Sequence, residues 1–182
     1  EVKGNDIQLS IVNSLSLVTS SDKYSDEIEN KLNAVKTKVK LYEGELLLDK
    51  ANLAQRKRDH LEYSLLDKTF LDLKNNYNVN ETVKDLRDLI AHTGDTSNLI
   101  LDPDLDSYYI MDSTLIAIPQ LYGRLFDVKN LIKDIKKNGQ INEENKIKLS
   151  VMLAMLKESD WGRVLASTQT AINEDKNFYN LN

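Results

Sequence analysis

The sequence predicts an all-α protein, an elongated antiparallel helical bundle with long helices. Three observations lead to this prediction. Only 6 Gly and 2 Pro occur in 182 residues, which leaves few positions for the tight turns that strands need. Apolar residues recur every three or four positions along most of the chain, as on one face of a helix. The chain is 41% hydrophobic and 29% charged, which suits a soluble bundle with a real core. A four-helix bundle or two stacked bundles fit this pattern.

The first half predicts two helices followed by a turn. The first helix has one apolar face, formed by Ile7, Ile11, Leu15 and Val18. From Asp22, a suitable N-cap, an amphipathic pattern runs to residue 66. Because only Gly44 interrupts this pattern, we expect a continuous helix of about 40 residues, roughly 60 Å long. The charge run at residues 56–62 predicts a solvated face, and the Asn-rich residues 75–80 predict a turn.

The next helix is expected to begin near Glu81. Its stripe is aliphatic up to Ile90 and then becomes small and polar at Thr93, Thr96 and Ser97. Small side chains let a neighbouring helix or a ligand come close. Tight helix packing explains each of these residues taken alone. Their clustering also fits close approach of a ligand.

The second half of the chain also contains residues that are typical of helix starts, kinks and ends. Asp102 fits an N-cap, and Pro103 fits the first helical position, where a missing N–H costs nothing. Pro119 falls inside the long apolar pattern that follows and should kink the helix or open it by one hydrogen bond. Gly139 fits the C-cap, and Asn142 begins a last helix whose apolar phase shifts near residues 159–162.

The sequence offers no catalytic machinery. Cys is absent, no Gly-rich phosphate loop or nucleophile motif occurs, and no basic stripe indicates a nucleic-acid partner. The alternating aspartates from Asp102 suggest a calcium loop, but Ser107 and Ser113 stand where an EF-hand needs Gly and Glu. His60 is expected at the surface, and a surface or packing role suits His92 better than ligand contact. We therefore predict neither an enzyme nor a metal or cofactor site.

The candidate ligand-binding residues lie on both sides of the two-helix joint at residue 102. They are polar or aromatic side chains that an aliphatic bundle does not need: Thr93, Ser97, Asn98, Tyr108, Tyr109 and Asp112. Asp112 follows Tyr108 and Tyr109 by one helical turn, so the three can share a face. A small-molecule pocket and a buried polar network that merely joins helices explain this group equally well.

Residues 94–120, GDTSNLILDPDLDSYYIMDSTLIAIPQ, carry a resemblance. They resemble a segment of the extracytoplasmic helical sensor regions of methyl-accepting chemotaxis proteins and sensor histidine kinases. In those regions DPDLDSYYLMD recurs and a proline follows; here Ile110 replaces the Leu, and Pro119 falls in place. The match covers about one-seventh of the chain.

The resemblance implies an extracytoplasmic, periplasmic sensor domain of an inner-membrane protein, spanning residues 1–182 between two membrane helices. It implies a homodimer that binds an unknown small molecule and displaces one helix relative to its neighbours. Chemotaxis and phosphotransfer both remain open as outputs. A structural, dimerising bundle without a ligand is the alternative. The start at Glu1 rather than Met favours a segment of a longer chain over a processed, mature protein.

Overall fold

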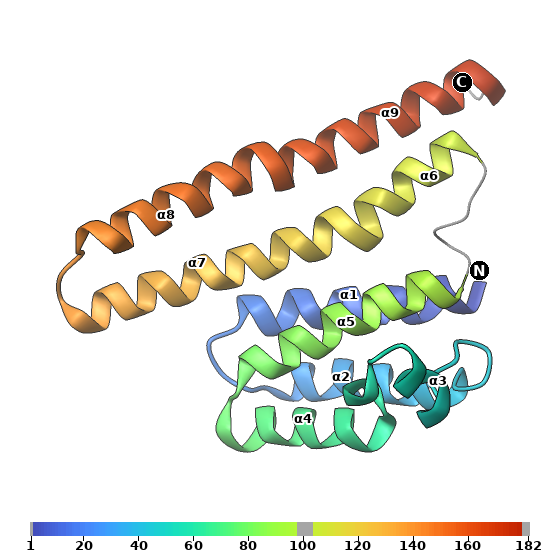
Figure 1. Cartoon of the computed structure of the whole chain (residues 1–182), viewed down its shortest axis with the longest axis horizontal. Coiled ribbons are helices and arrows are strands. Elements are labelled where there is room, and N and C mark those ends of the chain that lie inside the picture. The colour runs from blue at the N-terminus through green and yellow to red at the C-terminus, as the bar shows by residue number, and fades with distance from the viewer. Residues whose placement is uncertain (1, 98–103, 180–182) are drawn as a thin grey trace. The chain divides into compact units, whose positions relative to one another are not determined.

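The computed structural model describes residues 2–97 and 104–179, of which residues 175–179 are described by their backbone alone. The fold is all-α, as predicted, and the described residues contain no strand (Figure 1). The chain divides into two compact units, Glu1–Leu101 and Asp102–Asn182, and each is described by itself. That the two together form a single domain stays a prediction. In the described part of the chain, no helix is both long enough and apolar enough to cross a membrane.

Unit 1 is a four-helix bundle. Its main helices are α1 (Val2–Ser20), α2 (Asp26–Leu41), α4 (Tyr63–Asn76) and α5 (Val79–Thr96). Helix α1 packs against α2 and α5, and α4 packs against the same two helices, which closes the bundle. The apolar face predicted for the first helix is buried, and the other helices supply matching faces. The fully buried side chains include Ile7, Ile11, Leu15, Ile28, Leu32, Leu66, Leu73, Leu86 and Leu89.

The continuous helix predicted for residues 22–66 is wrong. Helix α2 starts at Asp26, where the N-cap is Ser25 rather than Asp22, and it ends at Leu41. The chain then turns to bury Leu46 and Leu48 and restarts at α3 (Lys50–Gln55), where Asp49 accepts hydrogen bonds from two backbone N–H groups. A 3-10 turn, η1 (Asp59–Leu61), precedes α4. The break includes Gly44, and burial of two leucines together with a good N-cap at Asp49 favours it over a continuous helix.

The predicted turn at residues 75–80 is present. Helix α4 ends at Asn76, and α5 begins at Val79. The left-handed position between them is Tyr77 at φ 53°, not one of the asparagines. Its backbone N–H donates to the carbonyl of Leu73, which closes the end of α4.

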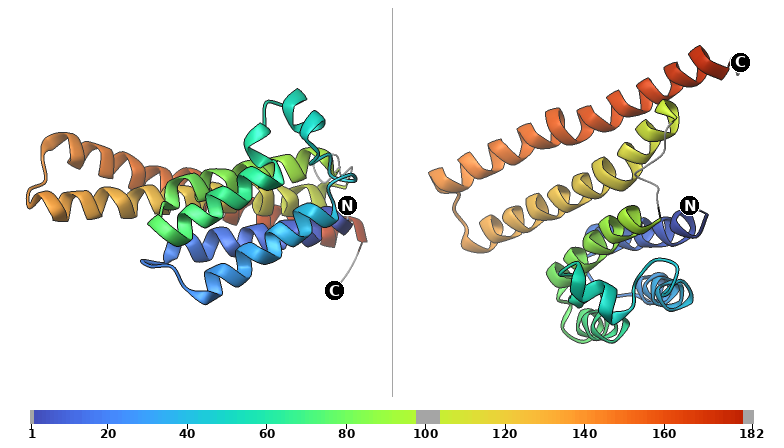
Figure 2. Two further views of the ribbon diagram at one scale, coloured as in Figure 1. Left: turned by 90° about the horizontal axis from the view of Figure 1, so that it is seen from below. Right: turned by 45° about the vertical axis from the view of Figure 1, so that its right-hand side comes forward.

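Unit 2 is a hairpin of two long helices, which lie side by side in all views (Figures 1 and 2). The first consists of α6 (Leu105–Met111), the π segment η3 (Asp112–Ala117) and α7 (Ile118–Asn138). The second consists of α8 (Glu143–Met155), the π segment η4 (Leu156–Trp161) and α9 (Gly162–Tyr179). The predicted C-cap at Gly139 and the start at Asn142 are confirmed: Gly139 has φ 71°, and Asn142 caps α8 by accepting from the Asn145 N–H at 2.8 Å. The first helix begins after Asp104; the predicted cap at Asp102 and Pro103 lies outside the described residues.

Each long helix contains one extra residue in its middle. In η3 the Ile118 N–H donates to the carbonyl of Ser113, five residues back, just before Pro119. Because Pro119 has no N–H, the helix opens as the sequence predicts. In η4 the Gly162 N–H donates to the carbonyl of Lys157 in the same way. This second π segment accounts for the phase shift of the apolar pattern near residues 159–162.

Candidate functional site

The densest polar network of unit 2 surrounds Asp112, the first residue of η3. Asp112 is buried, and both of its carboxylate oxygens accept hydrogen bonds from side chains of α9. Oδ2 accepts from Arg163 Nε at 3.0 Å and from Ser167 Oγ at 2.8 Å, while Oδ1 accepts from Arg163 Nη2. The hydrogen bonds from Arg163 hold the pKa of Asp112 below its usual value, although burial acts in the opposite direction. Asp112 is therefore ionised at neutral pH and joins the two helices.

A second arginine–aspartate pair joins the same two long helices, but here the aspartate belongs to the second long helix and the arginine to the first. Asp160 of η4 is 1% exposed, and its carboxylate accepts from Arg124 Nε and, at 3.4 Å, from Arg124 Nη2. Each π segment thus supplies a buried aspartate, and the opposite long helix supplies its arginine. Bidentate arginine–carboxylate pairs require a fixed geometry. The two pairs together therefore specify the axial register of the two long helices.

The two tyrosines lie at the same place, one turn before Asp112. Their rings pack edge to face, with centroids 5.5 Å apart and planes at 79°. Tyr108 is 42% exposed and Tyr109 is half-buried. The hydrogen bond to Asp112 raises the pKa of Arg163, although burial acts in the opposite direction, and Tyr108 lies near enough to Arg163 to interact with it electrostatically. The predicted grouping of Tyr108, Tyr109 and Asp112 is thus present on one helix.

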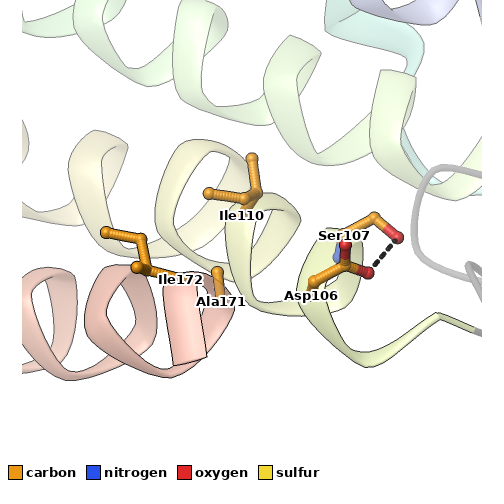
Figure 3. A pocket seen from close by; sticks show the side chains of 5 residues that line it. All are labelled: Asp106, Ser107, Ile110, Ala171 and Ile172. Carbon is orange, nitrogen blue, oxygen red and sulfur yellow. Dashed lines mark hydrogen bonds between the residues drawn. The ribbon is translucent and has the colours of Figure 1, made fainter. Parts of the chain in front are cut away.

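A pocket opens beside this network, between α6 and α9 (Figure 3). Its volume is about 380 Å³, and its described lining is Asp106, Ser107, Ile110, Ala171 and Ile172. Asp106 Oδ1 accepts from the Ser107 N–H at 2.7 Å, so its carboxylate is oriented at the pocket's polar end. Its described lining residues all belong to unit 2 and combine one carboxylate with aliphatic side chains.

The remaining predicted residues belong to unit 1. Thr93 is fully buried, and within the described chain its Oγ1 has no hydrogen-bond partner. Ser97 Oγ donates to the carbonyl of Thr93 at 2.6 Å. Ser97 also helps to line a pocket of about 430 Å³ in unit 1, with Val2, Lys3, Gly4, Glu45, Leu46 and Thr96. Asn98 lies outside the described residues. The predicted group therefore divides between two units.

His92 has a packing role in unit 1. It is fully buried, and its Nε2 lies 2.8 Å from the carbonyl oxygen of Leu46. Because a carbonyl can only accept, Nε2 carries the hydrogen and Nδ1 accepts from Arg58 Nη1 at 3.4 Å. Burial lowers the pKa of His92, and the charge of Arg58 lowers it further. The imidazole is thus neutral and fastens the turn after α2 to α5.

The charge run at residues 56–62 is more than a solvated face. Arg58 pairs with Asp95 at 2.7 Å, and His60 pairs with Asp88 at 2.9 Å. Both carboxylates stand on α5, on either side of His92. These contacts hold η1 against α5, which corrects the expectation of a purely solvated segment; His60 itself is half-buried and keeps a third of its side chain exposed.

Sequence reasoning missed Arg163, Ser167, Arg124 and Asp160. Arg163 and Ser167 are four residues apart and so share a face, but that spacing is common on helices. Which turn of the last helix meets Asp112 depends on the hairpin register, and the extra residues in η3 and η4 change that register. Among the described residues, no cluster of three or more His, Asp or Glu side chains could hold a metal ion.

Comparison of this chain with known protein families, with curated proteins and with solved structures found no match.

Proposed function

We propose that this chain is the extracytoplasmic, ligand-sensing domain of a bacterial transmembrane signalling receptor. In this proposal it acts as a homodimer, is joined to the membrane through flanking segments, and transmits small-molecule binding by displacement of a helix. The resemblance of residues 94–120 to receptor sensor regions supports the sensing role. The arrangement of unit 2 supports the mechanism.

The observation that carries the proposal is the contact of Asp112 with Arg163 and Ser167. Asp112 belongs to the receptor-like motif, and its partners stand on α9, the last helix of the chain. In a receptor of this kind the last helix leads toward the membrane. A ligand that alters the start of α6 would therefore act on the output helix through the ion pair between Asp112 and Arg163.

The π segments suit such a displacement. Their hydrogen bonds span five residues instead of four, and π segments inside α-helices occur frequently at functional sites. A long helix moves as a rigid element, so a shift at one end reaches the other end tens of ångströms away. The Asp112–Arg163 and Asp160–Arg124 pairs would each have to break or re-form during that shift, which gives two discrete states rather than a continuous slide.

The proposal is tested first by ligand binding. The purified chain is screened by thermal shift against amino acids, amines, organic acids and sugars; we expect one chemical class to raise the melting temperature. In the full-length receptor, Asp112→Asn should still allow binding but should abolish the change in signalling output. Asp134→Asn, at an exposed position of α7, is the matched control and should preserve both. If no compound shifts the melting temperature and Asp112→Ala merely destabilises the chain, the proposal fails.

A structural, dimerising bundle is the second candidate, and one observation favours it. The last long helix exposes large apolar side chains to solvent, namely Ile147, Val151, Leu153, Met155, Trp161, Leu165 and Ile172. Large exposed apolar side chains repeated along one helix are typical of an interaction surface. Sedimentation of the chain and of its Trp161→Glu and Leu165→Glu variants, with Leu9→Glu in unit 1 as control, tests for a dimer through this helix. A dimer that binds no compound in the screen supports the structural role over sensing.

A further inference from the structure

We propose that the pocket lined by Asp106, Ser107, Ile110, Ala171 and Ile172 binds an organic cation, an aliphatic primary or quaternary amine. This inference rests on the proposed sensing function and names its ligand class. In the bound state the ammonium group pairs with the Asp106 carboxylate, and the aliphatic body lies against Ile110, Ala171 and Ile172.

The shape of the pocket fits a small molecule with one polar end. Asp106 and Ser107 belong to the first turn of α6 and lie together at one end, whereas Ile172 and Ala171 come from α9 (Figure 3). A volume of about 380 Å³ falls in the range of ligand pockets. Ile110 and Ile172 are 48% and 45% exposed, so a ligand body would cover apolar surface that now faces water.

The charge of the pocket selects a cation. Asp106 Oδ1 is oriented by the Ser107 N–H, with Ser107 Oγ at 3.5 Å, and no described Lys, Arg or His pairs with this carboxylate. An anionic ligand would meet a like charge. A neutral apolar ligand would strip water from the carboxylate without replacing it, which costs free energy.

The nearby Arg163 does not make an anionic ligand more favourable than a cation. Arg163 directs both Nε and Nη2 to Asp112, so its charge is already matched within the network. Among the described lining residues, Asp106 alone carries a formal charge, and that charge is negative. An ammonium group adds charge-assisted hydrogen bonds to a carboxylate whose Oδ2 has no partner in the described chain.

The position of the pocket couples it to the helix contact. Ala171 lies one helical turn beyond Ser167, which donates to Asp112. On the other helix, Ile110 lies two residues before Asp112. A ligand that touches both α6 and α9 therefore bridges them next to the Asp112–Arg163 pair and stabilises one relative position of the two helices.

The test is a matched set of probes that share one aliphatic arm. Hexylamine and hexyltrimethylammonium are compared with hexanoate and hexanol by thermal shift and by equilibrium dialysis on the purified chain. We expect the two cations to bind and to raise the melting temperature, and hexanoate and hexanol to do neither. Binding of hexanoate as tight as that of hexylamine would overturn the inference.

Two variants locate the binding. Asp106→Asn keeps the side-chain shape and removes the charge, and it should weaken hexylamine binding by about tenfold or more. Asp127→Asn, an exposed aspartate on α7, should leave binding unchanged. Ile172→Lys alters an exposed position, so folding is retained, and it puts a like-charged ammonium group into the pocket lining; it should abolish cation binding. Unchanged binding in Asp106→Asn and Ile172→Lys would place the cations elsewhere and overturn the inference.

This inference and the proposed function fail in different ways. If the broad screen finds a ligand that is an acid, a sugar or another class, and the amines do not bind, then the amine inference alone is overturned. If no compound of any class binds, the sensing function is overturned with it.

Discussion

The two units of this chain are stabilised in different ways. Unit 1 closes four helices around leucine and isoleucine side chains that are fully removed from water. Unit 2 has only two long helices, and its larger buried apolar side chains, Met111, Leu115, Phe126 and Val128, each keep 7–8% of their surface exposed. At its centre it buries two carboxylates instead, and each pairs with an arginine that stays partly exposed.

This difference separates a rigid part from a part that can change. Apolar packing is dense and non-directional, so a closed bundle has one deep minimum. Paired charges and π segments are directional, and a different pairing can give a second arrangement of similar free energy. The contrast places any conformational response in unit 2, and the following predictions test it.

The largest effect is expected in the core of unit 1. Leu86→Ala should lower the free energy of unfolding by about 2–5 kcal/mol, because a fully buried leucine leaves a cavity. Leu115→Ala in unit 2 should cost less, since Leu115 is 8% exposed. Urea denaturation is followed by circular dichroism for the whole chain and by fluorescence of Trp161, its single tryptophan, for unit 2.

The control for this comparison is Leu71→Ala. Leu71 is 54% exposed on α4, so its truncation should change stability by no more than about 0.5 kcal/mol. A Leu115→Ala loss equal to or greater than the Leu86→Ala loss would remove the contrast between the units.

Arg124→Ala should lower the free energy of unfolding by a smaller amount, about 2–3 kcal/mol, because it leaves the Asp160 carboxylate buried without its partner. Replacing both residues, Arg124→Leu with Asp160→Leu, should restore most of that stability while it removes the geometric constraint. Fluorescence of Trp161, next to Asp160, reports the transition. Lys148→Ala breaks an exposed pair with Glu144 and should cost about 0.5 kcal/mol or less. A double variant as unstable as Arg124→Ala would contradict this account.

The smallest effect near neutral pH is expected from His92. Its folded pKa is lowered by burial, so the unfolded chain binds a proton more readily than the folded chain. Unit 1 should therefore be fully stable above the ordinary histidine value of 6.5 and should lose stability as the pH falls below it. Asp112 in unit 2, whose folded pKa is also lowered, should lose its contribution only as the pH falls below 3.8.

Urea midpoints measured across this pH range check the order of the two losses. His92→Gln should flatten the first pH dependence, and Asp112→Asn should flatten the second. If Trp161 fluorescence reports loss of unit 2 at a higher pH than the loss of unit 1, the assignment of these two groups is wrong.

Local patterns predicted the fold class and the apolar faces because helical periodicity depends on residues only three or four positions apart. The face formed by Ile7, Ile11 and Leu15 and the caps at Gly139 and Asn142 depend only on neighbouring residues. The break after α2 was missed because Leu47 and Lys57 adopt positive φ, which a leucine or a lysine in the sequence does not indicate.

The candidate site could be predicted only in part. Tyr108, Tyr109 and Asp112 follow one another on a single helix, so their grouping is a local property. Arg163 and Ser167 meet Asp112 across 51 and 55 residues, and their alignment depends on the hairpin turn and on two π segments. Pro119 indicates the first of these segments, whereas the second leaves only a shift of phase in the sequence.

The extra residues in η3 and η4 also constrain how this sequence can evolve. A π segment holds one residue more than the α-helix around it, so deleting a single residue there restores regular winding and rotates everything beyond it by about 100°. A deletion in η4 would turn α8 relative to α9 by that angle and would move the side chains that now face α7 out of this contact. We therefore expect this hairpin to tolerate point substitutions at solvent-facing positions outside its proposed binding surfaces better than it tolerates a change in helix length.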